Sequence, residues 1–188
     1  MKGYIRVRFL NIFGAPVQIH WSALVVMGFL FIVSVRTPLL AIITICSYFG
    51  FILLHEAGHA YLARRLGYRP REIYLGLFHG YCTLDAPDNL RDECIIAWGG
   101  VLAQLVVAVP LIVLNQTTPL AQLSFTGPIV AFLGFISLIF ALVNLLPIRN
   151  LDGIKAWQLI SIEIKHFRNK AAAKKSAQDV IRRLKNRS

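Results

Sequence analysis

The chain has 188 residues, of which 56% are hydrophobic and only 15% are charged, and its mean hydropathy is +0.61. This composition excludes an ordinary soluble domain and is typical of an integral membrane protein. The net charge of +11 would suit a nucleic-acid binder, but the sequence contains no recognisable nucleic-acid module and most of the excess lies near the C-terminus. An anionic lipid surface explains the charge more simply, and we expect no nucleic-acid partner.

The N-terminal residues predict a short hairpin at the membrane surface. Residues 4–9 and 17–20 alternate between polar and apolar side chains with a period of two, as strands do. The sequence Phe13-Gly14-Ala15-Pro16 between them is a turn signal.

Four apolar segments follow, and we interpret them as membrane-spanning helices at about residues 21–35, 39–62, 95–114 and 128–146. Residues 36–38 and 115–119 contain the prolines and polar residues that separate neighbouring spans. Residues 72–77 and 80–84 have strand patterns. The predicted fold class is an all-α membrane core of about four transmembrane helices with a small β-sheet at the cytoplasmic membrane interface, within residues 1–164.

The basic residues predict the orientation of these spans. Lysine and arginine precede the first span, lie between the second and third, and follow the fourth, whereas only Arg36 falls in the other two connections. By the positive-inside rule, both termini and the far end of the second span are cytoplasmic. We therefore expect a multi-pass protein of the cell (cytoplasmic) membrane.

Residues 165–188 form a basic cytoplasmic tail with nine Lys and Arg residues and one acidic residue, Asp179. Its apolar residues recur at helical spacing, which predicts an amphipathic helix lying on anionic lipid. They are Ala177, Val180, Ile181 and Leu184. A solvated and partly disordered basic end accounts for the same composition equally well.

The strongest chemical signal is His55-Glu56-Ala57-Gly58-His59, near the cytoplasmic end of the second span. Two histidines at i and i+4 lie on one face of a helix, so both can reach one metal ion. Glu56 is positioned to take a proton from a metal-bound water. The extended motif of the metzincins is excluded, because Leu62 and Arg65 stand where its glycine and third histidine belong.

Asp152 is the candidate for the third protein ligand. It follows the fourth span, which must end on the same side of the membrane as His55 and His59, so the topology brings it to the matching depth. A carboxylate there would complete a set of three ligands and leave one position open. Glu72, Asp85 and Asp88 lie in a polar segment, where solvated side chains are the default expectation.

His55-Glu56-x-x-His59, followed by Asn144-x-x-Pro147 and Leu151-Asp152-Gly153, resembles the site-2 protease family of intramembrane zinc metalloproteases, in its minimal bacterial or archaeal form. The glycine-rich residues 99–104 resemble the start of the family's third core helix, and residues 19–22 resemble the start of its first span. The chain departs from the family pattern at three places. Val101 replaces a proline, Gln104 replaces an asparagine, and Phe78-His79-Gly80 replaces a frequent glycine pair.

The resemblance implies that His55, His59 and Asp152 bind one Zn²⁺ ion, that Glu56 is the general base and acid, and that Asn144 contacts the substrate or the oxyanion. It implies regulated intramembrane proteolysis, in which a transmembrane protein or peptide is cleaved in or near its membrane-spanning segment. It also implies that the unwound substrate pairs with an edge strand, and the sequence leaves open whether this strand lies in residues 9–20 or 72–84. A regulatory membrane partner and a homo-oligomer are likewise left open.

The alternative function is a proteolytically inactive membrane protein that binds helices or metal. Such a relative should have lost Glu56 or a ligand, and all four residues are present. Asn144 could equally serve as a hydrogen-bonding residue between helices.

Other polar and aromatic residues have simpler structural interpretations. We interpret His20 as a membrane-interface residue, His79 as a loop residue and the tryptophans as interfacial anchors. The three cysteines form no C-x-x-C pair and are expected to pack as reduced thiols.

Overall fold

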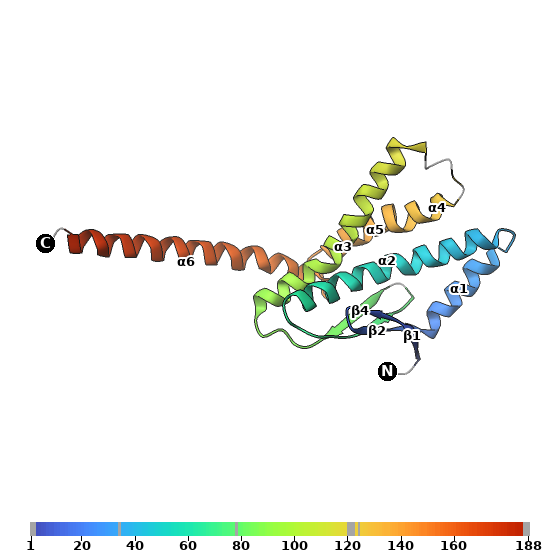
Figure 1. Cartoon of the computed structure of the whole chain (residues 1–188), viewed down its shortest axis with the longest axis horizontal. Coiled ribbons are helices and arrows are strands. Elements are labelled where there is room, and N and C mark those ends of the chain that lie inside the picture. Colours follow the sequence, from blue (N-terminus) through green and yellow to red (C-terminus); the bar gives the residue numbers. More distant parts are fainter. Residues whose placement is uncertain (1–2, 34, 78, 120–122, 124, 186–188) are drawn as a thin grey trace.

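The structure, a computed structural model, describes residues 3–33, 35–77, 79–119, 123 and 125–185, with the side chains of 177 and 179–185 excepted. A mainly helical body carries a small sheet on one side (Figure 1). The elements in chain order are β1 (Tyr4–Ile12), β2 (Ala15–His20), α1 (Trp21–Val33), α2 (Pro38–Arg65), β3 (Pro70–Leu75), β4 (Gly80–Leu84), α3 (Leu90–Thr117), α4 (Thr126–Ile129), the π-helical η2 (Val130–Ile136), α5 (Ser137–Asn144) and α6 (Gly153–Lys185).

Three helical stretches within the described residues are long and apolar enough to cross a membrane: α2, α3 and the continuous stretch Thr126–Asn144. They correspond to the second, third and fourth predicted spans. The first predicted span contains α1, which has 13 residues and rises only about 20 Å. A fourth crossing at this place therefore stays a prediction, while the fold class of an apolar helical core with a small sheet is confirmed.

The four strands form one sheet in the order β1-β2-β3-β4, so β1 and β4 are its edges. The β1–β2 hairpin is antiparallel, and its turn contains Phe13 (φ 52°) and Gly14 (φ 95°). Strand β2 pairs in parallel with β3, and β3 pairs antiparallel with β4. Both predicted strand pairs are thus confirmed, and they join into a single sheet.

One face of the sheet packs against α2 and forms the main core cluster with it. The fully buried members of this cluster are Ala15, Val17, Ile52, Ala60 and Ile73. Helices α1 and α2 together connect β2 to β3, so the chain returns to the sheet at the end of α2. The sheet therefore lies beside the half of α2 that carries the histidine motif. This packing brings β4 close to that motif.

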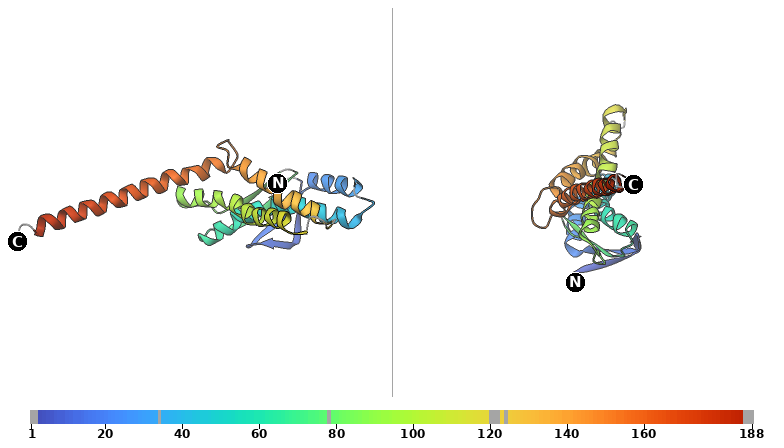
Figure 2. Two further views of the ribbon diagram at one scale, coloured as in Figure 1. Left: turned by 90° about the horizontal axis from the view of Figure 1, so that it is seen from above. Right: turned by 90° about the vertical axis from the view of Figure 1, so that its left-hand side faces the viewer.

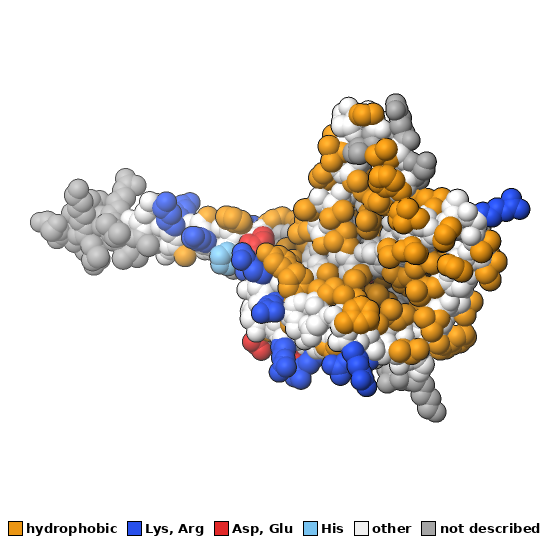
Figure 3. Space-filling model, turned by 45° about the vertical axis from the view of Figure 1, so that its right-hand side comes forward, with side chains coloured by type: hydrophobic (Ala, Val, Ile, Leu, Met, Phe, Trp, Pro, Cys, Tyr) orange, Lys and Arg blue, Asp and Glu red, His pale blue; other side chains and the backbone are white. Residues whose placement is uncertain are grey.

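The chain ends in the long helix α6, which leaves the body and projects along its long axis (Figures 1 and 2). The predicted tail is helical as far as Lys185 and is continuous with the residues before it. The side chains of Ala177, Val180, Ile181 and Leu184 lie outside the described part, so their contact with lipid stays a prediction. In Figure 3, Lys and Arg gather on the lower edge of the body and on α6, and hydrophobic side chains cover much of the rest.

Candidate metal centre

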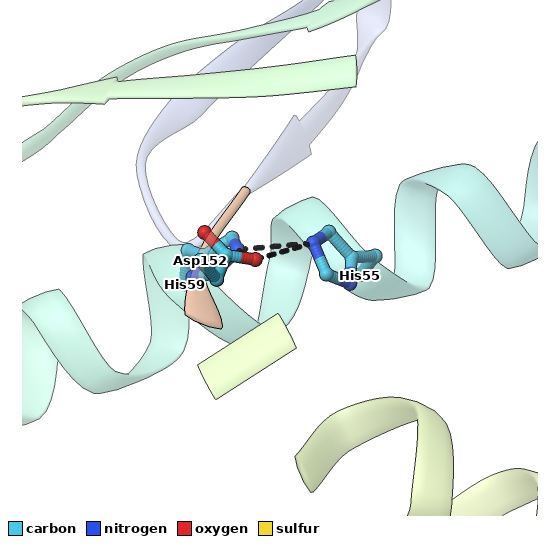
Figure 4. Close-up of side chains that lie close together, drawn as sticks. All are labelled: His55, His59 and Asp152. Atoms are coloured by element: carbon cyan, nitrogen blue, oxygen red, sulfur yellow. Dashed lines mark hydrogen bonds and ion pairs between the residues drawn. The ribbon is translucent and has the colours of Figure 1, made fainter. Parts of the chain in front are cut away.

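Three side chains converge at the C-terminal half of α2 (Figure 4). The Oδ2 atom of Asp152 lies 3.0 Å from His55 Nε2 and 3.2 Å from His59 Nε2, and the two Nε2 atoms are 3.2 Å apart. Ligand atoms bound at 2.0–2.1 Å around a tetrahedral ion are separated by about 3.3–3.4 Å. The three distances are shorter than this by at most about 0.4 Å, so the atoms lie close to the arrangement that a zinc ion requires.

The other ring nitrogens are held in a way that suits metal binding. His59 Nδ1 donates a hydrogen bond to the carbonyl oxygen of Ile96 at 2.8 Å, and His55 Nδ1 donates to Gln104 Oε1 at 3.0 Å. With Nδ1 as the donor, each neutral imidazole turns the lone pair of Nε2 toward Asp152. Three acceptor atoms that converge in this way fit a cation, and both partners of Nδ1 come from α3.

The loop between α5 and α6 holds Asp152 in place. The carbonyl oxygen of Asp152 accepts hydrogen bonds from the backbone of Lys155 and Ala156, at 3.0 and 2.8 Å, so Asp152 directly precedes α6 and is tied to its first turn. A Cβ atom at Gly153 would lie 2.3 Å from the carbonyl oxygen of Leu146, so only glycine fits after it.

Two tryptophans brace the same loop. Trp157 Nε1 donates to the carbonyl oxygen of Leu145 at 2.6 Å, and Trp98 Nε1 donates to that of Ala156 at 2.9 Å. Both residues were expected to be interfacial anchors, and the structure gives them hydrogen bonds that tie α3, α6 and the loop together. They therefore help to fix the position of Asp152.

Glu56 is only 4% exposed and lies next to β4. A Cβ atom at Gly80 would approach Glu56 Cγ to 2.7 Å, so the missing side chain of Gly80 lets the strand lie against the carboxylate. A cavity of about 890 Å³ opens here, and His55, Glu56, His59, Asn144 and Asp152 all line it. The structure thus brings every predicted site residue to one cavity.

Asn144, at the end of α5, is buried at the edge of the cavity. Its Nδ2 atom donates to the carbonyl oxygen of Phe140, one turn earlier in the same helix, at 3.1 Å. This bond leaves Oδ1 and one N–H of the amide for another partner. Of the acidic residues expected to be solvated, Asp85 lies in an exposed ion pair with Arg71 at 2.6 Å.

The sequence interpretation missed several residues of the cavity. His79, expected to be a loop residue, lines it together with Cys82 of β4, Glu93 of α3 and Lys155 of α6. Burial, with a contribution from Glu56, raises the pKa of the Cys82 thiol to about 12, so this thiol is protonated. The alternation of β4 could have indicated that Gly80 and Cys82 share a face, but not that this face meets Glu56.

No protein-family model matches the chain. A Synechocystis sp. protein with the provisional name zinc metalloprotease is 29% identical over 183 residues, which are 90% of this chain and 47% of the relative. A zinc metalloprotease of Methanocaldococcus jannaschii is 23% identical over 149 residues, which are 78% of this chain and 43% of the relative. The chain thus spans about half the length of the curated relatives it matches.

The fold has a counterpart among solved structures. The site-2 protease from Methanocaldococcus jannaschii superposes with a TM-score of 0.62 and 22% identity, over 85% of this chain and 72% of that one. The site-2 protease fold that the motifs predict is therefore confirmed, and the sequence relatives are zinc metalloproteases, as the resemblance implies.

Proposed function

We propose that this chain is the core of an intramembrane zinc endopeptidase, with His55, His59 and Asp152 as the zinc ligands and Glu56 as the general base and acid. The observation that carries the proposal is the convergence of the three ligand atoms beside a buried glutamate on the wall of a large cavity. Ionisable groups are costly in an apolar helix, and such a cluster is a functional site by default.

His55, His59 and Asp152 would hold the zinc ion, which would supply Lewis acidity for the scissile carbonyl and the attacking water. Glu56 takes the proton of that water and passes it to the nitrogen of the leaving amine. Burial of Glu56 beside β4 keeps its carboxylate in one place. Asn144 uses the free part of its amide to orient the substrate carbonyl, and His55 and His59 are kept in their tautomers by Gln104 and Ile96.

We further propose that β4 is the edge strand with which the substrate pairs. It is the last strand of the sheet, and Gly80–Leu84 run along the cavity that contains Glu56. A transmembrane segment that unwinds beside β4 would gain backbone hydrogen bonds there, and its scissile bond would lie near the metal. The β1 edge lies at the other side of the sheet and does not line this cavity.

The proposed location is the cell membrane with both termini in the cytoplasm. Arg64 and Arg65 lie in the last turn of α2, one to two turns beyond His59, which supports a site close to the cytoplasmic surface. Substrates in regulated intramembrane proteolysis would then release a cytoplasmic fragment. The basic tail favours anionic lipid as a partner.

The test is co-expression with candidate membrane substrates of the parent protein and of Glu56→Gln. We expect Glu56→Gln to retain zinc and to accumulate an uncleaved membrane precursor that proteomic comparison identifies. Equal cleavage by both proteins would contradict the assigned role of Glu56. Zinc binding with no cleavage by the parent would favour the inactive, metal-binding alternative.

A further inference from the structure

A second hollow, of about 470 Å³, lies between the β1–β2 hairpin and the beginning of β3. None of its lining residues lines the cavity of the metal centre. Its polar lining consists of Arg6, Asn11, Arg69, Arg71 and Glu72. Three arginines therefore surround one small depression at the rim of the sheet.

A break in strand pairing accompanies the hollow. The register of β1 with β2 changes from Val7 opposite Val17 to Asn11 opposite Pro16, so residues 8–10 have no facing partners on β2. Such bulges bend a strand and redirect its side chains. Phe9, within the bulge, is 91% exposed, which is the largest exposed fraction among the exposed large hydrophobic side chains of the described residues.

The charges of the hollow are only partly compensated. Arg71 forms an ion pair with Asp85 at 2.6 Å, and Glu72 accepts hydrogen bonds from Gln18 Nε2 at 2.7 Å and from the Tyr74 hydroxyl. Among the described residues, no ion pair engages Arg6 or Arg69. Two guanidinium groups thus remain for an anion, and their fork geometry suits the oxygens of a phosphate.

The hollow lies at the level of the charged end of α2. A Cβ atom at Gly14 in the hairpin turn would lie 4.0 Å from Arg64 Nη1, and the rings of Phe13 and Tyr61 are 5.5 Å apart. Residues at this end of a membrane-spanning helix lie where phosphate groups of a bilayer leaflet are found. The exposed side chains of Phe9 and Ile5 on the same edge strand suit contact with acyl chains.

We propose that this hollow binds the phosphate of an anionic phospholipid, with Arg6 and Arg69 contacting the phosphate oxygens and Phe9 inserted among the acyl chains. The site is separate from the metal centre and from the basic tail. Its position on the hairpin would tie the sheet to the lipid surface, independently of whether the chain cleaves peptides.

The test is native mass spectrometry of the full chain in detergent, titrated with phosphatidylglycerol, phosphatidylcholine or inorganic phosphate. We expect Arg6→Gln combined with Arg69→Gln to weaken phosphatidylglycerol binding about tenfold or more. The matched control is Arg36→Gln combined with Arg149→Gln, which removes the same charge from exposed positions outside the hollow and the basic tail and should change binding less than about twofold. Equal losses for the two pairs, or no loss for the Arg6 and Arg69 pair, would overturn the proposal.

The titrations with phosphatidylcholine and inorganic phosphate, together with the Phe9→Ser variant, identify the ligand. Phosphatidylcholine should bind about tenfold more weakly than phosphatidylglycerol, because its choline group compensates the phosphate charge. Phe9→Ser, at an exposed position that folding does not require, should weaken lipid binding and leave phosphate binding unchanged. If inorganic phosphate displaced phosphatidylglycerol at equal concentration, and Phe9→Ser had no effect, the hollow would be a site for soluble phosphate and the lipid proposal would be wrong.

Discussion

Gly100 of α3 lies directly against the imidazole of His55: a Cβ atom at Gly100 would be 2.5 Å from His55 Cε1 and 2.6 Å from its Nδ1. The ring of His55, a proposed zinc ligand, is therefore held from one side by a residue without a side chain. One turn away, a Cβ at Gly58 would lie 2.2 Å from the carbonyl oxygen of Gly99, so the backbones of α2 and α3 touch at their crossing. Gly58 and Gly99 set the distance between the two helices, and the absence of a side chain at Gly100 leaves room for the His55 ring.

Gly100→Ala should displace the His55 ring and weaken zinc retention about 10–100-fold, the range seen when groups that orient metal ligands are altered. Competition with a chromophoric chelator measures this. Gly28→Ala is the matched control, because no atom lies within 4 Å of the Cβ it would add to α1. Unchanged zinc affinity in Gly100→Ala would show that the site has more room than the structure indicates.

Gln104→Leu separates metal binding from folding. Gln104 is fully buried, and its Oε1 holds His55 while its Nε2 has no hydrogen-bond partner. Leucine removes the bond to His55, so zinc retention should fall about 10–100-fold. It also removes an unsatisfied donor, so the free energy of unfolding should be unchanged or rise by about 1 kcal/mol. Thermal unfolding in detergent and chelator competition measure the two quantities on the same sample. A fall in both the free energy of unfolding and the zinc affinity would contradict the expectation that Gln104 acts on metal binding alone.

Asp152→Asn tests the third ligand without disturbing the beginning of α6, because asparagine is as good a helix N-cap as aspartate. The neutral amide should lower zinc affinity by more than the roughly 100-fold that an orienting group can cost. Circular dichroism should show the same helix content as the parent protein. Zinc content equal to that of the parent would remove Asp152 from the ligand set.

Gly80→Ala addresses the contact between β4 and Glu56. The added Cβ would lie 2.7 Å from Glu56 Cγ and 2.8 Å from the carbonyl oxygen of Tyr74, so the strand or the glutamate must shift. We expect zinc content to be retained and cleavage of a membrane substrate to fall at least about tenfold, since a small misplacement of a catalytic group has a large effect on rate. Gly127→Ala, with nothing within 4 Å, is the control. Loss of zinc in Gly80→Ala would show that β4 supports the ligands rather than Glu56.

The convergence of His55, His59 and Asp152 could be predicted because each step rested on a strong regularity. Helical spacing places His55 and His59 on one face, and the positive-inside rule brings Asp152 to the same end of the membrane core. The strands at 4–9, 17–20, 72–77 and 80–84 followed from alternation and turn residues.

What escaped prediction depends on contacts between segments far apart in the sequence. Nothing in residues 80–84 indicates which helix the strand meets, because that contact exists only through the absent side chain of Gly80. The role of Gln104 was hidden for the same reason, since its partner His55 is 49 positions away. The first apolar segment was expected to continue to Val35, whereas α1 ends at Val33.

Asp152 would contribute a side-chain oxygen to the proposed metal centre, and its main-chain oxygen accepts hydrogen bonds from the first turn of α6. A 33-residue helix is about 50 Å long, so a tilt of about 5° at its first residue moves its far end by about 4 Å. The distance between two spectroscopic labels, one near Lys175 and one on the body, would therefore report whether the metal centre is filled.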